Sequence, residues 1–358
     1  MSGFEALIMQ DKGFVIYRIP NEKPVLILQE KNPIQCLRDL DELNGKTGFV
    51  FAPFQIKDSS PLMLMQPDVT VAGREDIDKY LSHVCIEDEK AGAGNDRSFL
   101  SGDYESYSSA FSSFITSLKE KRFEKLVLSR TSVHTKESSF SLKEVFYNAC
   151  ERYNDAFVYL YHTPETGTWL GSTPEILLTG ENACWNTVAL AGTLPYKKAL
   201  LPDAWSMKNR KEQQLVADYV RDRLVSKGIA PSVNGPFTVR AGELAHLKSE
   251  FSFSLSDKSN LGSLLKLLHP TPAVCGLPKE EAYQFIIENE GYDRRYYSGF
   301  MGFINPDGKT DLYVNLRCME IGEDRLTLYA GGGLLSHSEL DMEWRETEAK
   351  LQTMLDLI

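Results

Sequence analysis

The sequence lacks both an excess of basic residues and a long apolar run, and each absence excludes a class of function. Lys and Arg total 39 against 50 Asp and Glu, so the 358-residue chain has a formal net charge of −11. An acidic chain without a basic cluster is a poor partner for the phosphate backbone of nucleic acid. No segment approaches the roughly 18 apolar residues of a membrane span, and the first residues do not resemble a secretory signal. We therefore expect a soluble, cytoplasmic protein that binds neither nucleic acid nor membranes.

The spacing of cysteines and histidines excludes further classes. The six cysteines form no CxxC pair, and the six histidines form no HxxxH or HExxH motif. Zinc sites and small disulfide-stapled domains would show such clustering, so we expect reduced thiols in or near a core and no zinc hydrolase. Phosphate loops of the GxGxxG or GxxxxGK[ST] type are also absent, so a nucleotide cofactor is not indicated.

The hydrophobic patterns predict a mixed α/β fold of the α+β type. Short β-rich runs are joined by turns such as Asn305-Pro306-Asp307-Gly308, a strong hairpin signal, and regular βαβ alternation is missing. We expect antiparallel sheets packed with helices around a deep site. The predicted strands are Gly13–Ile19, Pro24–Leu28, Gly48–Phe54, Leu126–Val133, Phe157–Tyr161, Phe237–Val239, Gly299–Ile304, Leu312–Met319 and Arg325–Ala330. The predicted helices are Tyr104–Arg122, Leu142–Tyr153, Ser206–Lys227, Lys279–Glu290 and about Glu339–Ile358.

No linker divides the chain. The most polar stretch, Glu87–Gly102, is typical of one exposed loop rather than a domain boundary. We therefore expect residues 1–358 to form a single domain.

One carboxylate continues the apolar stripe of the helix Ser206–Lys227. Stepping back three residues from Leu215, or four from Val216, leads to Glu212. A buried carboxylate without a partner costs several kcal/mol, so Glu212 in a core would need a cation beside it. Alternatively, the stripe has ended and Glu212 lies in solvent at the start of the helix.

The last helix contains a similar group. Glu343, Glu346 and Lys350 share one face by i, i+3, i+4 spacing, and Glu346 with Lys350 could be an ordinary surface pair. Just before this helix, Gly331-Gly332-Gly333 closes a strand, where backbone N–H groups could approach an anion, or where the chain simply turns. Together these segments are compatible with a site for a carboxylate and a metal ion.

Four further segments, in this order along the chain, resolve these alternatives. They are Lys125-Leu-Val-Leu-Ser-Arg130, Gly171-Ser-Thr-Pro-Glu175 with Leu190-Ala-Gly-Thr193, Leu268-His-Pro-Thr-Pro-Ala273, and Glu343-Trp-Arg-Glu-Thr-Glu-Ala-Lys350. This set, with Asn315-Leu-Arg-Cys318, resembles the chorismate-utilising enzymes, which include isochorismate, salicylate, anthranilate and aminodeoxychorismate synthases. The resemblance covers 104–358 as a chorismate-binding catalytic region, with 1–103 as a variable N-terminal part of the same fold.

The resemblance implies a role for each unusual side chain. Glu212, Glu346 and Glu343 match the family's Mg²⁺-binding glutamates, and Mg²⁺ suits one or two carboxylates plus substrate oxygens. Contacts with the substrate chorismate are implied for Gly192, Thr193, His246, Ala273, Tyr297, Arg317, Gly331, Gly332 and Lys350. Without the family, His246 would be interpreted as a core histidine and Arg317 as a surface arginine on a strand.

The resemblance also bears on the nucleophile. Members that use water have a lysine base at the position of Lys125, whereas those that use ammonia have a glutamine, and Glu175 falls on the family's general acid. Ala191 replaces the nucleophilic lysine of one aminodeoxychorismate synthase subgroup. Without the family, Lys125 would be a solvated residue that opens a strand.

We therefore expect an Mg²⁺-dependent isochorismate synthase, an isomerase that adds water at C2 of chorismate and removes the C4 hydroxyl. A salicylate synthase with pyruvate-lyase activity, or a non-catalytic chorismate-binding subunit, are the alternatives. We expect a monomer without a glutamine amidotransferase partner. The product could feed menaquinone, siderophore or salicylate biosynthesis.

Overall fold

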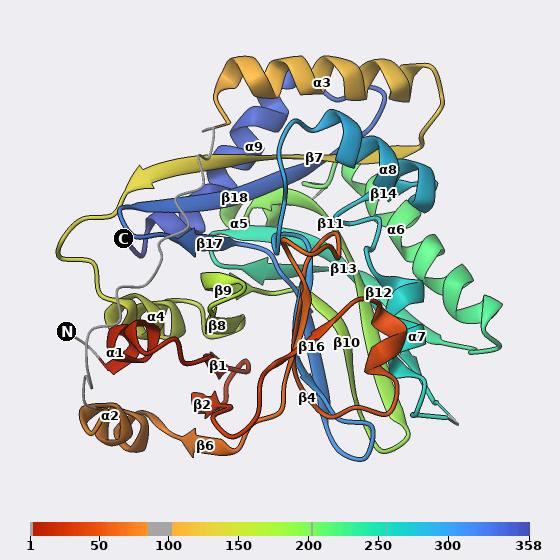
Figure 1. Cartoon of the computed structure of the whole chain (residues 1–358). Coiled ribbons are helices and arrows are strands. Elements are labelled where there is room, and N and C mark those ends of the chain that lie inside the picture. The colour runs from red at the N-terminus through yellow and green to blue at the C-terminus, as the bar shows by residue number, and fades with distance from the viewer. Residues whose placement is uncertain (1–2, 85–101, 202, 256) are drawn as a thin grey trace.

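The chain folds into two antiparallel sheets with helices on their outer faces (Figure 1). The computed structural model describes residues 3–84, 102–201, 203–255 and 257–358. In these residues the first sheet has the order β14 (Gly276–Leu277), β7 (Lys125–Thr135), β18 (Arg325–Leu334), β17 (Cys318–Ile321), β9 (Gly167–Thr173), β8 (Phe157–Thr163), β1 (Phe14–Arg18), β2 (Val25–Leu28) and β6 (Val69–Ala72). The second has the order β12 (Ser232–Ala241), β13 (Leu244–Phe253), β11 (Cys184–Pro195), β10 (Ile176–Glu181), β16 (Thr310–Val314), β15 (Phe300–Ile304), β4 (Gly48–Ala52), β5 (Leu62–Met65) and β3 (Gln35–Leu37). The predicted fold class is confirmed.

A layer rich in aromatic rings joins the two sheets. The Phe51 ring of β4 stacks on Tyr161 of β8 at 4.2 Å between ring centroids, and on Tyr296 at 4.4 Å. Phe157 of β8 stacks on Tyr313 of β16 at 4.5 Å. Offset stacking at these separations adds to the free energy gained by burying the rings, so the two sheets share one core.

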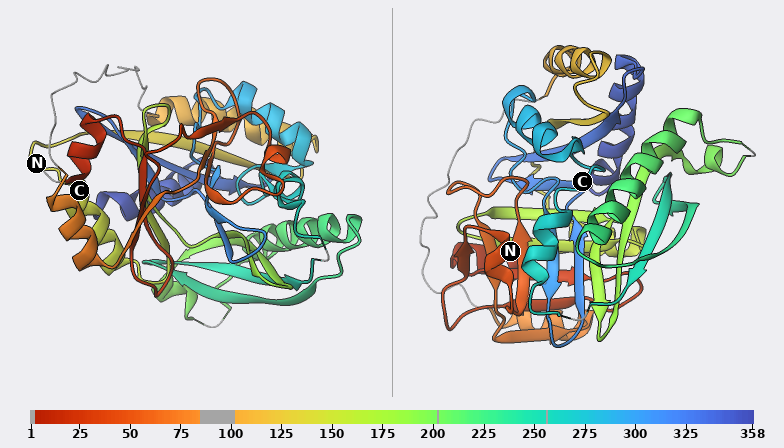
Figure 2. Two further views of the ribbon diagram at one scale, coloured as in Figure 1. Left: turned by 60° about the horizontal axis from the view of Figure 1, so that its bottom comes forward. Right: turned by 90° about the vertical axis from the view of Figure 1, so that its right-hand side faces the viewer.

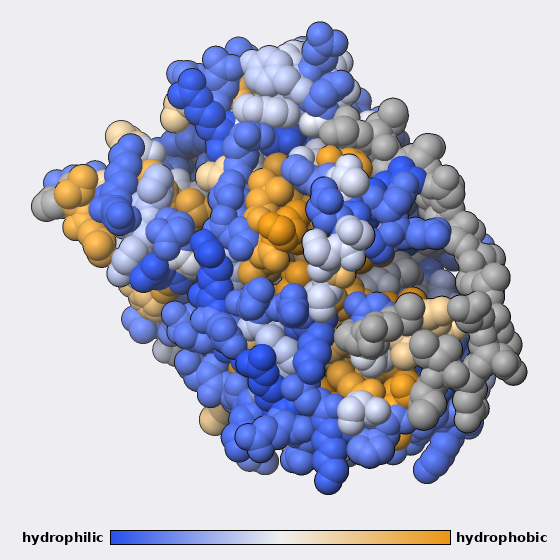
Figure 3. All heavy atoms as spheres, turned by 90° about the vertical axis from the view of Figure 1, so that its left-hand side faces the viewer, coloured by the Kyte–Doolittle hydropathy of each residue, from blue (hydrophilic) through white to orange (hydrophobic). Residues whose placement is uncertain are grey.

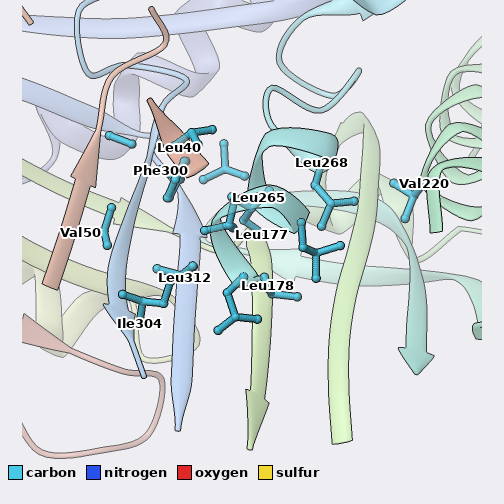
Figure 4. Close-up of a cluster of buried hydrophobic side chains, with 14 of the residues drawn as sticks. Leu40, Val50, Leu177, Leu178, Val220, Leu265, Leu268, Phe300, Ile304 and Leu312 are labelled. Atoms are coloured by element: carbon cyan, nitrogen blue, oxygen red, sulfur yellow. The ribbon is translucent and has the colours of Figure 1, made fainter. Parts of the chain in front are cut away.

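Helices cover the outer faces. The helices are α1 (Gly3–Met9), α2 (Arg74–Ser82), α3 (Tyr104–Lys119), α4 (Leu142–Arg152), α5 (Tyr196–Ala199), α6 (Met207–Ser226), α7 (Leu261–Leu268), α8 (Lys279–Asn289) and α9 (Leu340–Leu355), with a 3₁₀ turn, η1 (Leu40–Leu43). Helices α1, α2, α4 and α9 share a core with the first sheet, and α6 and α7 share one with the second. Figure 4 shows this second cluster, in which Leu265 and Leu268 of α7 face Leu177 and Leu178 of β10. Figure 2 shows α6 lying over β11 and β13.

Helix α6 forms where its sequence pattern predicts. The Ser206 side chain caps the helix by accepting a hydrogen bond from the Asn209 N–H, and Val216, Val220 and Leu224 are buried against the second sheet. Glu212 is also buried, at 7% exposure, so the interpretation that it lies in solvent is wrong.

Two predicted strand boundaries are wrong. The segment predicted as one strand, Leu312–Met319, is divided into β16 and β17 at Asn315, whose buried side chain accepts from Tyr159 and donates to the Tyr296 carbonyl. The three glycines predicted to form a turn lie inside β18, where Gly331 pairs with Ser129 and Gly333 with Val127. The predicted hairpin at Asn305–Gly308 is confirmed, because β15 pairs with β16.

The predicted environment of the cysteines is only partly confirmed. Cys36 and Cys184 are exposed, so the prediction of thiols in or near a core is wrong for these two, whereas Cys275 and Cys318 are buried. Cys85 and nearly all of the predicted loop Glu87–Gly102 lie outside the described residues. None of the described helices is long and apolar enough to cross a bilayer. The face shown in Figure 3 is largely hydrophilic, with apolar side chains in separate patches.

Candidate active site

A cavity lies where α6, α9 and the ends of β11 and β18 meet. Its empty space is about 630 Å³, including the part open to solvent. Most of the residues predicted to form the site line it, namely Glu175, Gly192, Thr193, Glu212, His246, Ala273, Tyr297, Arg317, Gly331, Glu346 and Lys350. Lys125, Gly332 and Glu343 are not among the residues that line the cavity in the described part of the chain. The fold thus brings together residues that are up to about 225 positions apart in the sequence.

Lys125 and Glu212 form a buried ion pair at the base of this cavity. The Lys125 side chain, at the start of β7, is fully buried, and its Nζ lies 3.0 Å from Glu212 Oε1. The interpretation of Lys125 as a solvated residue is therefore wrong. Gly333 makes the pair possible, because a Cβ there would lie 1.9 Å from Glu212 Oε1 and 2.9 Å from Lys125 Cε. A side chain at this position would displace the Glu212 carboxylate or the Lys125 side chain from the positions they have here.

Glu175 is a buried carboxyl group with a raised pKa. It follows the end of β9, where its N–H donates to Thr173 and its carbonyl accepts from the Val314 N–H. Burial raises the pKa of Glu175 from 4.5 to about 7, although Lys125, Lys350 and Arg317 oppose this rise. Near neutral pH the group is divided between its two protonation states, which suits a proton donor.

Arg317 is held in place by a neutral histidine. His246 Nδ1 lies 2.8 Å from the Gly192 carbonyl, which can only accept, so Nδ1 holds the proton. Burial, aided by Arg317, lowers the pKa of His246 to about 3, so Nε2 is free to accept from the Arg317 guanidinium at 3.2 Å. The guanidinium is almost fully buried and lines the cavity, where it can donate to an anion. His246 therefore lines the cavity, and its contact with the substrate stays a prediction.

Helix α9 brings two carboxylates and a cation to the end of β18. Lys350 donates to Glu346 Oε1 at 2.7 Å and to the Gly331 carbonyl at 2.8 Å. Burial raises the pKa of Glu346, but Lys350 outweighs this effect and the pKa is lowered. Glu343 is buried and pairs with Lys208 of α6, while burial and Glu346 raise the pKa of Glu343. The predicted shared face of this helix therefore points toward the cavity and not into solvent.

A second set of contacts fixes α9 against β7. Arg130 Nε donates to Thr347 at 2.8 Å, and the guanidinium lies 3.7 Å from the centroid of the Trp344 ring. Because Thr347 follows Glu346 directly, this contact fixes the part of α9 that carries the Glu346 carboxylate.

A buried ionic network supports the opposite wall. Glu290 accepts from the Ser129 N–H at 2.6 Å and from Arg294 Nε at 2.6 Å. Arg294 also donates to the carbonyls of Val127 and Val274, both of which line the cavity. The sequence analysis missed this network, although the i,i+4 spacing of Glu290 and Arg294 was a usable signal. The sequence analysis also missed Lys208. Its position one helical turn before Glu212 could have indicated that it lies near the acidic groups.

The charged groups suit a hard cation. Glu212, Glu343 and Glu346 offer only oxygen donors, and the buried Glu343 Oε2 has no hydrogen-bond partner among the described residues. A Cβ on Gly332 would lie 3.5 Å from both Glu343 Oε2 and Glu346 Oε1, so these oxygens converge above a glycine. Within the described ranges no three acidic, His or Cys side chains are arranged closely enough to hold a metal ion by themselves. The donor set therefore fits Mg²⁺ bound by one or two carboxylates with water or substrate oxygens.

The chain is similar to known proteins over most of its length. The family model for chorismate binding enzymes matches residues 71–358. Isochorismate synthase EntC of Escherichia coli (strain K12) is 32% identical over 209 residues, which are 56% of this chain and 54% of that protein. The match thus spans about half the length of this curated relative.

Two solved structures share the fold. DhbC of Bacillus anthracis, described as a 2,3-dihydroxybenzoate-specific isochorismate synthase, superposes with a TM-score of 0.79 at 22% identity over 99% of both chains. Anthranilate synthase component I of Streptococcus pneumoniae superposes with a TM-score of 0.70 at 18% identity over 96% of this chain and 92% of that one. The fold therefore accompanies more than one reaction, and the choice between reactions depends on the residues of the site.

Proposed function

Because the chain belongs to the chorismate binding enzymes, we propose that it is an isochorismate synthase that adds water at C2 of chorismate and removes the C4 hydroxyl. The observation that supports this most directly is Glu175, a buried carboxyl group with a pKa of about 7 facing the same cavity as Arg317 and Lys350. A departing hydroxyl needs a proton, and a carboxyl group that is partly protonated at neutral pH can supply it.

Lys125 is the proposed base, and its ion pair with Glu212 defines what must happen first. A lysine accepts a proton only in its neutral form, so the ion pair seen here has to be broken before Lys125 can activate water. Glu212 is also a proposed metal ligand, which links the two roles. When bound, Mg²⁺ supplies positive charge that neutralises the ring carboxylate of the substrate.

The remaining polar groups bind and orient the substrate. Arg317, directed by His246, is suited to a two-point contact with a carboxylate, and Lys350 adds a second positive charge at Gly331. Gly192 has a φ of 73° at the irregular pairing of β11 with β13, which turns its carbonyl toward His246. Thr193, Ala273, Tyr297, Gly331 and Gly332 complete the proposed substrate-binding set, and all of these except Gly332 line the cavity.

Two residues support water rather than ammonia as the nucleophile. Lys125 stands where the ammonia-using members have a glutamine, and Ala191 provides no amine for a covalent intermediate. We therefore propose that the chain acts without a glutamine amidotransferase subunit, as a cytoplasmic monomer.

Product analysis tests this proposal. The purified protein is incubated with chorismate and Mg²⁺, with and without ammonium, and the products are separated by chromatography, with Glu175→Gln as the control for contaminating activity. We expect isochorismate in a reversible reaction, and no product from the control above background. Anthranilate in the ammonium sample, or mainly salicylate and pyruvate, would show that the assignment is wrong.

A further inference from the structure

Lys208 forms a contact that the proposed reaction does not use. It lies in the first turn of α6 and pairs with Glu343 of α9, so the contact joins the two helices that supply the acidic groups. The Lys208 side chain is 21% exposed and that of Glu343 is 1% exposed. Lys208 is not among the described lining residues, so a substrate in the cavity does not account for it.

Each of the three carboxylates is matched by one lysine. Glu212 pairs with Lys125 at 3.0 Å, Glu346 with Lys350 at 2.7 Å, and Glu343 with Lys208. Lys125 is the proposed base and Lys350 a proposed substrate-binding cation, so the reaction already gives both lysines a reason to lie in the site. Lys208 differs from the other two because it has no proposed role in the reaction and does not line the cavity among the described residues, so its contact with Glu343 is left to explain.

We infer that Lys208 is a tethered counter-cation, a positioning residue that competes with the metal ion for the acidic cluster and so weakens metal binding in the absence of substrate. This inference rests on the proposed metal site. A buried carboxylate requires a cation, and the Lys208 ammonium provides one when no metal is bound. A metal ion at Glu343 Oε1 and an ammonium on the same oxygen exclude each other, and the positive charge also repels a cation at Glu346.

The arrangement of the cluster supports this competition. The described carboxylates are not grouped into a preformed metal site, while Glu343 Oε2, the oxygen that Lys208 does not contact, is buried without a partner. A lysine with a merely structural role would join α6 to α9 and leave metal affinity unchanged, or would support it. Removing the charge of Lys208 should therefore raise metal affinity if Lys208 competes with the metal ion, and should leave it unchanged or lower it if the role is structural.

Metal binding to full-length protein without chorismate separates these roles. Mn²⁺ is titrated and followed by electron paramagnetic resonance, and Mg²⁺ by calorimetry, for the wild type and Lys208→Met. We expect Lys208→Met to bind either ion at least about tenfold more tightly, because one unit of positive charge beside the cluster is removed. In EDTA the melting temperature of Lys208→Met should be lower than that of the wild type. Saturating Mg²⁺ should raise the melting temperature of the variant by more than it raises that of the wild type.

Two variants serve as controls. Lys208→Arg keeps the charge and should bind metal within about threefold of the wild type. Lys211→Met removes the same charge from an exposed position on the same helix, where solvent screens it, and should change affinity by about twofold at most.

The outcomes distinguish this inference from the proposed function. If folded Lys208→Met binds Mn²⁺ as weakly as the wild type or more weakly, or if neither binds metal at millimolar concentration, the inference is overturned. If Lys208→Met binds metal more tightly and the wild type still makes no isochorismate, the role of Lys208 stands and the proposed reaction fails.

Discussion

Replacing Glu175 with Gln should inactivate the enzyme and stabilise it at alkaline pH. Burial raises the pKa of this carboxyl group from 4.5 to about 7 in the folded protein, so ionisation costs stability. Between those two pH values the folded state binds more protons than the unfolded state, and the free energy of unfolding falls as the pH rises. Ionising Glu175 lowers the free energy of unfolding by about 3 kcal/mol at pH 8 but by less than about 1 kcal/mol at pH 5.

Glutamine keeps the shape of the side chain and removes this cost. At pH 8 the free energy of unfolding of Glu175→Gln should therefore be about 3 kcal/mol higher than that of the wild type. For a chain of this length, this corresponds to a melting temperature about 4 °C higher. At pH 5 the two proteins should differ by much less. Urea unfolding at both pH values, followed by circular dichroism, measures the difference.

The same variant tests the catalytic role. Its kcat should fall by roughly 10²–10⁴-fold, because an amide cannot protonate a leaving hydroxyl, while chorismate binding stays near normal. Wild-type activity should itself fall as the pH rises above about 7, as Glu175 loses its proton. A stability difference that is the same at pH 5 and pH 8 would refute the assigned pKa, and retained kcat would refute the role as acid.

Three further perturbations test other parts of the site. Lys125→Ala should lower kcat by roughly 10²–10⁴-fold with little change in the dissociation constant for chorismate; a loss of affinity at unchanged kcat would make Lys125 a substrate ligand instead. EDTA should abolish activity and Mg²⁺ should restore it. Glu346→Ala should need a far higher Mg²⁺ concentration for activity than the wild type. Full activity of Glu346→Ala at ordinary Mg²⁺ concentration would show that Glu346 is only a helix-surface charge. Glu290→Gln should lower the free energy of unfolding by about 3–5 kcal/mol, because the buried Arg294 loses its partner; urea unfolding with a loss below about 1 kcal/mol would contradict the ionic network.

Much of the site was predictable because its signals are local. The stripe of α6 left Glu212 either buried or at the solvent-exposed start of the helix, and i,i+4 spacing placed Glu346 beside Lys350. The partners were not predictable in this way. Lys125 is fully buried beside Glu212 of α6, and no pattern in the sequence near Lys125 indicates that α6 comes close to the start of β7. The roles of these residues came from the resemblance to the family and stay predictions.

Several strands were missed, and β9 shows one physical reason. The sequence analysis did not predict β9, β10, β11 or β13, although β11 and β13 form the longest pairing of the second sheet. β9 is buried at six consecutive positions, so it lacks the alternation of apolar and polar residues that marks a strand with one exposed face. The glycines of β18 have weak strand preference, and only their pairing with β7 holds them extended.

The pairing of β7 with β18 also has a consequence for the order in which the protein folds. It joins residues about 200 positions apart, from Leu126 opposite Leu334 to Thr135 opposite Arg325. Contacts of such long sequence separation form slowly, because most of the chain must lose conformational entropy before they stabilise anything. Lys125 and Gly333 meet only when this ladder closes. Glu212 on α6 therefore gains its Lys125 partner only when this long-range ladder is formed, so the charge balance of the site depends on a contact between distant parts of the sequence.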